Sequence, residues 1–363
     1  MLYIFVKDMW VFVALLNNNF CKYFNDEHNL IHIGLMEIKL YINILLTNIT
    51  MIIMDIVPTP DNFKIQAINY LIHAIDLLYK SEIENPMLFL SNNSDYLLDS
   101  EEHWLQNQTT LLNALAMLFL SVENYLKTQI CTISPYLLIA KKPSEWNKDF
   151  KELHFHSFED LIELYERVFN KEKTLKNKFD KLRRIRNIFN HGLQDEDILP
   201  NFVINYVYDF LTDLWGIDWV KEIKKEIPFL PDMSYVDNES YPSARLSQYV
   251  YFIEKYLGKR KIKKLLGMGN SRRYICPSCI HIANVIENCT NNFSYASLDP
   301  NTPDSTLLRC FICDKKYKIT RGSCIYCPGN VLFTNNNDFY CYDGLDCAAC
   351  EKICLTCGHD QRV

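Results

Sequence analysis

The cysteines of this chain are crowded into its last quarter, and their spacing constrains the fold more than any other feature. Of the 14 cysteines, only Cys21 and Cys131 lie before residue 276, and ten of the others form five C-x-x-C pairs. A C-x-x-C turn places two thiolates on one side of a tight loop, and two such turns enclose a metal ion in a closed site. The sequence therefore predicts a small zinc-ribbon (β) module at 271–363, in a reducing, cytoplasmic setting.

The cysteine pairs predict structural zinc, with two ions expected and a third left open. Three pairs together with Cys341 and His359 are too many ligands for one ion. The second site begins at Cys324 and Cys327, whose partners are either Cys354 with Cys357 or Cys341 with one of Cys347 and Cys350. The first site is predicted to hold Cys276, Cys279, Cys310 and Cys313. All predicted metal ligands are Cys276, Cys279, Cys310, Cys313, Cys324, Cys327, Cys341, Cys347, Cys350, Cys354 and Cys357.

The preceding part of the chain follows a helical pattern. High aromatic content (13%) and only 10 glycines favour helices over a many-stranded β fold. Apolar residues recur at intervals of three and four, most clearly at Ile65, Ile68, Leu71, Ile72, Ile75 and Leu78. A loop is expected at 91–102, and further helices at 110–130, 157–169, 174–191 and 200–215. The predicted fold class is mainly α, with a helical bundle followed by the cysteine-rich module.

Four segments are expected along the chain. Residues 1–53 form an apolar extension that we do not expect to be part of the native protein, because Met54 opens a stretch typical of an ordinary start. Neither apolar run in it reaches the roughly 20 clean residues that span a bilayer. The helical bundle is expected at 54–226, a linker and basic helix at 227–270, and the zinc ribbons at 271–363.

The segment RRIRNIFNHG, at 183–192, concentrates polar chemistry at the end of one predicted helix. The buried stripe of this helix is Leu175, Phe179, Leu182, Ile185 and Phe189. A neighbouring strip holds Arg183, Asn187, Asn190 and His191, and the long side chain of Arg186 can join it. The guanidinium of Arg186 suits phosphate oxygens, and the helix dipole stabilises a protonated histidine near neutral pH. The alternative is an ordinary basic helix end that faces water.

The hexad R-N-x-x-x-H, from Arg186 to His191, resembles the signature of HEPN domains, which are helical bundles of prokaryotic toxins and antiviral systems. The resemblance covers roughly 100–215, because SVENYLKTQI with PYLLIAKKP, then SFEDLIELYERV and KLRRIRNIFNHG, are similar to successive segments of a prokaryotic HEPN subset. It implies a metal-independent endoribonuclease that dimerises and joins two motifs in one composite site.

The same resemblance implies a role for each site residue. Arg186 would bind the scissile phosphate, His191 would act as general acid or base, and Asn187 would orient them. Glu123, in SVENYLK, stands where many members have a polar residue on the neighbouring helix. The alternative for Glu123 is a surface pair with Lys127 at i+4.

RNA is the expected partner, through a local site rather than a generally basic surface, since the net charge is -6. The expected RNA contacts are Arg183, Asn190, Lys259, Arg260 and Lys261, and the neighbouring Arg272 and Arg273 offer further phosphate contacts. The leading hypothesis is an endoribonuclease of a toxin or defence system, with a homodimeric bundle, zinc ribbons that recruit RNA or a protein partner, and no membrane. The alternatives are a non-catalytic zinc-dependent adaptor and a nucleotide-binding partner of a nucleotidyltransferase.

Overall fold

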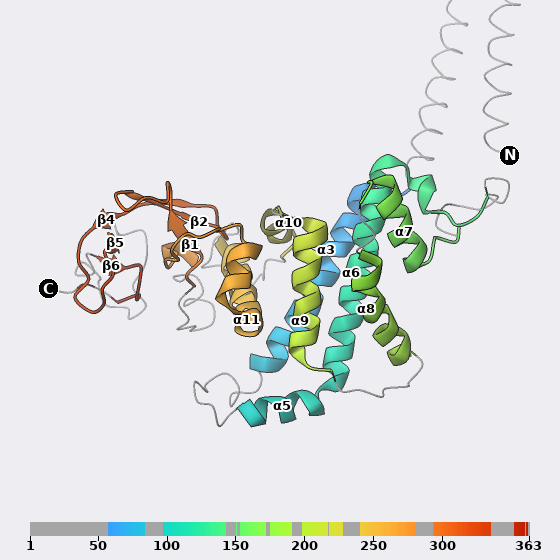
Figure 1. Ribbon diagram of the computed structural model, residues 1–363, viewed down its shortest axis with the longest axis horizontal. Helices are drawn as coiled ribbons and strands as arrows, with labels where there is room; N and C mark the ends of the chain where they lie inside the picture. Colours follow the sequence, from blue (N-terminus) through green and yellow to red (C-terminus); the bar gives the residue numbers. More distant parts are fainter. Residues whose placement is uncertain are drawn as a thin grey trace, which may run out of the picture. The chain divides into compact units, whose positions relative to one another are not determined.

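The chain is mainly helical, with small antiparallel sheets in its C-terminal part, as predicted (Figure 1). The computed structural model describes residues 57–83, 97–142, 150, 153–171, 175–190, 198–216, 218–227, 240–279, 293–334, 352–359 and 361. The expected extension at 1–53 lies outside these residues. No helix within the described ranges is long and apolar enough to cross a membrane.

Two compact units make up the chain. One contains residues 1–63 and 126–173, and the other contains residues 64–125 and 174–363. Helices α3 (Pro60–Ile83) and α6 (Gln108–Ile133) each contribute to both units. The domain bounds expected from the sequence stay predictions.

The smaller unit holds a 3-10 turn, η2 (Pro135–Leu138), and helix α7 (Phe158–Val168). Ser157 caps α7, because its hydroxyl accepts a hydrogen bond from the Asp160 amide (3.3 Å) and donates one to the Asp160 carboxylate (2.8 Å). The predicted helix start is thereby confirmed. In the same unit the Lys127 ammonium lies 5.3 Å from the centroid of the Phe155 ring.

In the larger unit, α3 and α6 are tied by a buried hydrogen bond from the Ser121 hydroxyl to the Ala67 carbonyl (2.6 Å). The predicted apolar stripe of α3 is buried from Ile68 to Leu78, but Ile65 is 40% exposed. Periodicity correctly predicts the helix and its apolar face, but it does not show where along the helix the covering neighbours end.

Helix α5 (Leu97–Gln106) occupies part of the range in which a loop was expected. That prediction was wrong from Leu97 onward. The indole of Trp104, on α5, is buried. Just after α5, the Gln108 side chain donates a hydrogen bond to the Ile198 carbonyl (2.8 Å) and accepts one from the Ile198 amide (2.9 Å). Long-range packing of this kind overrides the local preference of Asn, Ser and Asp for loops.

The other helices of this unit are α8 (Leu175–Asn190), α9 (Pro200–Asp209) with a π-helical turn η5 (Phe210–Trp215), α10 (Trp219–Glu226) and α11 (Ser240–Leu265). Helices α9 and α10 both contact α11. The Trp219 indole donates to the Leu265 carbonyl (3.0 Å), which joins α10 to the end of α11. Gly258 interrupts α11 with a left-handed φ of 76°, a conformation that glycine adopts without strain.

Two ion pairs fasten α11 to α3. Arg245 contacts Asp76 (2.9 Å), and Lys255 contacts the buried carboxylate of Glu82 (2.7 Å). Burial raises the pKa of Asp76, but hydrogen bonds from Lys80 and Tyr249 and the charge of Arg245 outweigh it, so this pKa is below its ordinary value. Both ion pairs lie before the break at Gly258, so they anchor the first part of α11 to α3.

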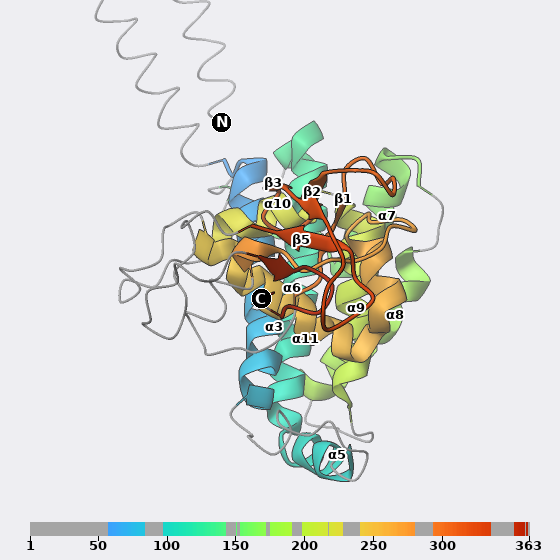
Figure 2. The ribbon, with the colours of Figure 1, turned by 90° about the vertical axis from the view of Figure 1, so that its left-hand side faces the viewer.

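Two three-stranded antiparallel sheets follow α11 (Figure 2). The first has the order β1-β2-β3, from β1 (Ala296–Leu298), β2 (Leu307–Cys310) and β3 (Lys316–Lys318). The second has the order β4-β5-β6, from β4 (Thr320–Arg321), β5 (Val331–Phe333) and β6 (Ile353–Cys354). Each sheet carries one cluster of cysteines.

Candidate functional sites

Two clusters of four cysteines are the best-defined sites among the described residues. The first centre contains Cys276, Cys279, Cys310 and Cys313, and the second centre contains Cys324, Cys327, Cys354 and Cys357. In each cluster the sulfur atoms all lie within 4.8 Å of one another. The predicted first site is confirmed as a cluster, and of the two arrangements left open for the second, the structure has the one with Cys354 and Cys357.

The spacing of the sulfurs fits a tetrahedral metal ion. Distances between Sγ atoms are 3.6 Å (Cys276–Cys313) and 3.9 Å (Cys279–Cys310) in the first centre. They are 3.8 and 3.7 Å in the second. A tetrahedron with metal–sulfur bonds of about 2.3 Å has edges of about 3.8 Å. A disulfide instead needs about 2.05 Å, and every described cysteine is a free thiol.

Thiols packed this closely require positive charge to ionise together. Hydrogen bonds from Cys276, Cys279 and Cys310 hold the pKa of Cys313 well below its ordinary value, while burial raises the pKa of Cys310. One thiolate is thus favoured at the expense of its neighbours. A central cation removes this conflict, and four thiolate ligands leave it no open position, so either site can hold a structural metal.

Both centres use the same backbone turn for their second pair of ligands. The Asp314 amide donates to the Cys310 carbonyl (3.1 Å), and the Gly358 amide donates to the Cys354 carbonyl (2.8 Å). In each case the residue after the second cysteine has a left-handed φ, 61° for Asp314 and 81° for Gly358. Amides inside the turns also point at sulfur, as Ile312 does toward Cys310 (3.4 Å).

Sequence reasoning missed the residues that support the ligands. The Tyr317 hydroxyl lies 3.6 Å from the Cys276 sulfur. The Gln361 amide donates to the Cys324 sulfur (3.3 Å), and its carbonyl accepts from the Ile325 amide (2.9 Å). The Thr356 side chain packs directly against Gly329. A Cβ at position 329 would lie only 2.6 Å from the Thr356 hydroxyl, so this position has no room for a larger residue. Only Gly329 carries a sequence signal, as a glycine that closely follows a cysteine knuckle.

The two sheets with their cysteines are joined to each other and to α11. The Ile275 amide, beside Cys276, donates to the carbonyl of Leu355, beside Cys354 (2.8 Å). Arg273 makes a two-pronged contact with Glu254 of α11 (2.9 and 2.8 Å) and donates to the Ser294 carbonyl (2.7 Å). Arg273, expected as a phosphate contact, is therefore engaged inside the protein.

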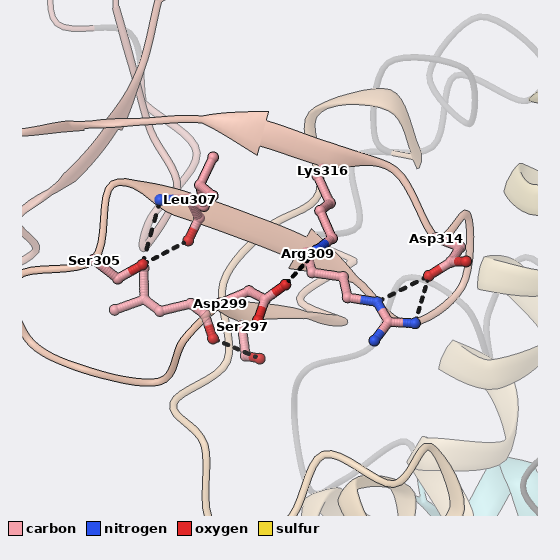
Figure 3. A network of polar contacts seen from close by, with 8 residues as sticks. Ser297, Asp299, Ser305, Leu307, Arg309, Asp314 and Lys316 are labelled. Carbon is pink, nitrogen blue, oxygen red and sulfur yellow. Dashed lines mark hydrogen bonds and ion pairs between the residues drawn. The ribbon is translucent and has the colours of Figure 1, made fainter.

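On the exposed face of the first sheet, two basic side chains are paired with carboxylates (Figure 3). Lys316 contacts Asp299 (2.9 Å), and its hydrogen bond holds the pKa of that carboxyl below its ordinary value. Arg309 contacts Asp314 (2.7 Å), next to the Cys313 ligand. Arg309 and Lys316 are therefore partly neutralised by neighbouring carboxylates, whereas Lys318 is exposed on the same face of β3.

Helix α8 carries most of the predicted active-site strip. Its stripe is buried at Leu175, Phe179 and Leu182, as predicted. Arg183 and Asn187 are half-buried, whereas Arg184 points outward with 71% of its side chain exposed and pairs with Asp180 (2.8 Å).

Part of the predicted active site lies outside the residues that the structure describes. The side chains of Arg186 and Asn190 and all of His191 lie outside what it describes. Glu123 is half-buried on α6. Arrangements of these residues therefore stay predictions.

The predicted RNA contacts on α11 are all exposed, but one of them has partners within the protein. Lys261 donates to the Asn205 side chain (2.8 Å) and lies 5.3 Å from the centroid of the Tyr208 ring. Lys259 and Arg260 are exposed on the last turns of α11. Outside the described residues lie Cys341, Cys347 and Cys350. His359 belongs to neither cysteine cluster, and its ring packs against Tyr326.

Comparisons with protein-family models, with curated proteins and with solved structures found no match to this chain.

Proposed function

We propose that this protein is an endoribonuclease of HEPN type that carries two structural zinc centres and acts as a homodimer in a toxin or antiviral defence system. The observation that supports this best is the position of the hexad from Arg186 to His191. It begins in the last turns of α8, a helix whose other face is buried at Phe179 and Leu182.

The reaction needs only side chains that this strip supplies. A histidine takes the proton of the ribose 2′-hydroxyl, and the 2′-oxygen attacks the adjacent phosphorus. The bond to the 5′-oxygen breaks, and that oxygen receives a proton as it leaves. An arginine neutralises the charge that develops on the phosphate oxygens. The products are a 2′,3′-cyclic phosphate and a 5′-hydroxyl, and DNA is not cut because it lacks the nucleophile.

Zinc is the metal we infer for both centres, because four thiolates in a closed tetrahedron favour zinc among common ions, with iron as the competitor. Elemental analysis of the purified protein should find two zinc ions per chain. Red-brown protein with stoichiometric iron would contradict this assignment.

The nuclease proposal is tested with matched variants of α8 and the residue that follows it. Purified wild type should cleave a labelled RNA, with and without EDTA during a short assay, and should leave DNA of the same sequence intact. His191→Ala should abolish cleavage. Arg184→Ala is the control, since this side chain lies on the same helix but is exposed and paired with Asp180. Equal cleavage by wild type and His191→Ala would refute the proposal.

A non-catalytic adaptor is the second candidate, and the exposed tip of the second centre favours it. Ile325 and Tyr326, between two metal ligands, are 62% and 57% exposed. An adaptor would lose its function with the ligands of the second centre, as in Cys357→Ser, and would be indifferent to His191→Ala. These two variants therefore separate the candidates.

A further inference from the structure

We propose that the tip of the second centre binds the unpaired bases of single-stranded RNA. The surface consists of Ile325, Tyr326 and the ring of His359, which we name the knuckle platform. The inference deepens the proposed function by giving RNA recruitment a named surface, and it rests on that function for the choice of RNA.

The knuckle platform is unusually exposed for its chemistry. Ile325 and Tyr326 occupy the two positions between Cys324 and Cys327, and more than half of each residue is exposed to water. A four-residue metal turn has no interior in which to bury them. Exposed apolar groups that lie side by side on a surface mark sites of interaction.

Hydrogen bonds fix the backbone of the turn that carries the platform. The Tyr326 amide donates to the Cys324 sulfur (3.3 Å), and the Ile325 amide donates to the Gln361 side chain (2.9 Å). Gln361 in turn donates to the Cys324 sulfur and to the His359 carbonyl (3.3 and 3.0 Å). A ligand that binds here loses little free energy to ordering of the protein.

The ring geometry suits a planar partner. The ring centroids of Tyr326 and His359 are 5.1 Å apart, with an angle of 32° between their planes. This is a tilted stack, so His359 backs part of the tyrosine ring while 57% of the Tyr326 residue stays exposed. A nucleobase can extend such a stack, because every base presents an aromatic face.

Bases fit this surface better than a folded protein does. A stable protein interface needs about 800 Å² on each partner, whereas three side chains offer room for one or two bases. The exposed residue Lys352 lies beside Gln361 along the backbone, since its carbonyl accepts a hydrogen bond from the Gln361 amide (2.8 Å). We expect the bases, rather than the phosphates, to contribute most of the affinity at this point.

Binding is measured by fluorescence anisotropy with the full chain, in a His191→Ala background that prevents cleavage. The probes are a single-stranded 12-nucleotide RNA and an abasic oligomer of the same length and charge. Tyr326→Ala should weaken binding of the RNA by about tenfold, and Tyr326→Phe should retain it. Tyr136→Ala is the matched control, because Tyr136 is also exposed (46%) but lies outside the ribbons.

Each outcome has a definite meaning. The abasic oligomer should bind weakly, and equally to Tyr326→Ala and its parent, with two metal ions per chain in every variant. Unchanged RNA affinity in Tyr326→Ala overturns the proposal, as does an equal loss for both probes. If cleavage is absent while binding depends on Tyr326, only the nuclease proposal fails; if cleavage occurs but binding ignores Tyr326, only the platform fails.

Discussion

The first and second cysteine centres share one backbone turn but are set in different surroundings. In the first centre, Cys276, Cys279 and Cys310 are buried, and the Tyr317 hydroxyl lies against the Cys276 sulfur. In the second centre only Cys354 is buried. The shared turn thus sets the geometry of the ligands. The side chains that pack around each cluster determine how far its ligands are shielded from water. The same difference leaves the tip of the second centre free to meet a ligand.

The largest effect is expected from removing one ligand in each centre. Cys310→Ser should lose the metal of both centres, because the second ribbon is held partly by the hydrogen bond from Ile275 beside the first. Cys357→Ser should lose only one metal, since the first ribbon is also fastened to α11 by Arg273. Structural zinc contributes about 10 kcal/mol or more to folding in small domains. We therefore expect each affected centre to lose its metal completely.

Zinc content by elemental analysis, together with urea unfolding, measures this asymmetry. Two metals fall to none in Cys310→Ser and to one in Cys357→Ser. A loss of one metal in both variants would show that the centres fold independently.

A smaller effect is expected at the ion pair that fastens the first ribbon. Arg273 and Glu254 are only 12% and 13% exposed, so Arg273→Met leaves a buried carboxylate unpaired and should cost about 3 kcal/mol of unfolding free energy. Arg309→Met removes a similar contact with Asp314, but one that is largely exposed, and should cost less than about 1 kcal/mol. Urea unfolding of both variants measures the difference. Comparable losses would mean that Arg273 does not anchor the ribbon.

Gly329→Ala should damage the second centre alone. The added Cβ would lie 2.6–3.0 Å from Thr356 and the Cys327 sulfur, so the turn must shift, at about 2 kcal/mol. Gly322→Ala is the control, because its nearest neighbour is the flexible end of Leu332 at 3.1 Å. Competition with a chelator should release one of the two metals more readily in Gly329→Ala. Release from both centres alike would contradict this prediction.

The first centre and most helices were predictable because their signals are local. Cysteine spacing identified the four ligands of the first centre. The pair Ser157 and Asp160 identified the start of α7. Packing between distant segments left no such signal. The pairing of Cys324 with Cys357 depends on a contact between Leu355 and Ile275, 80 residues apart in the chain, and α5 depends on the burial of Trp104. Arg273 looked like a free cation for the same reason, since its partner Glu254 lies on another element.

The smallest effects should come from substituting the residues with positive φ that end the two turns, Asp314 and Gly358. Gly358→Ala places a Cβ where φ is 81° and should destabilise the second ribbon by about 1 kcal/mol. Asp314→Gly relieves a similar conformation in the first ribbon but also removes the exposed contact with Arg309, so its net effect should be under about 1 kcal/mol. Chelator competition and urea unfolding resolve both changes. Asp314→Gly could instead weaken metal binding at the first centre more than Gly358→Ala weakens it at the second. In that case the contact of Asp314 with Arg309, and not the shared turn, determines the stability of the first centre. The two sites would then be less alike than their backbones indicate.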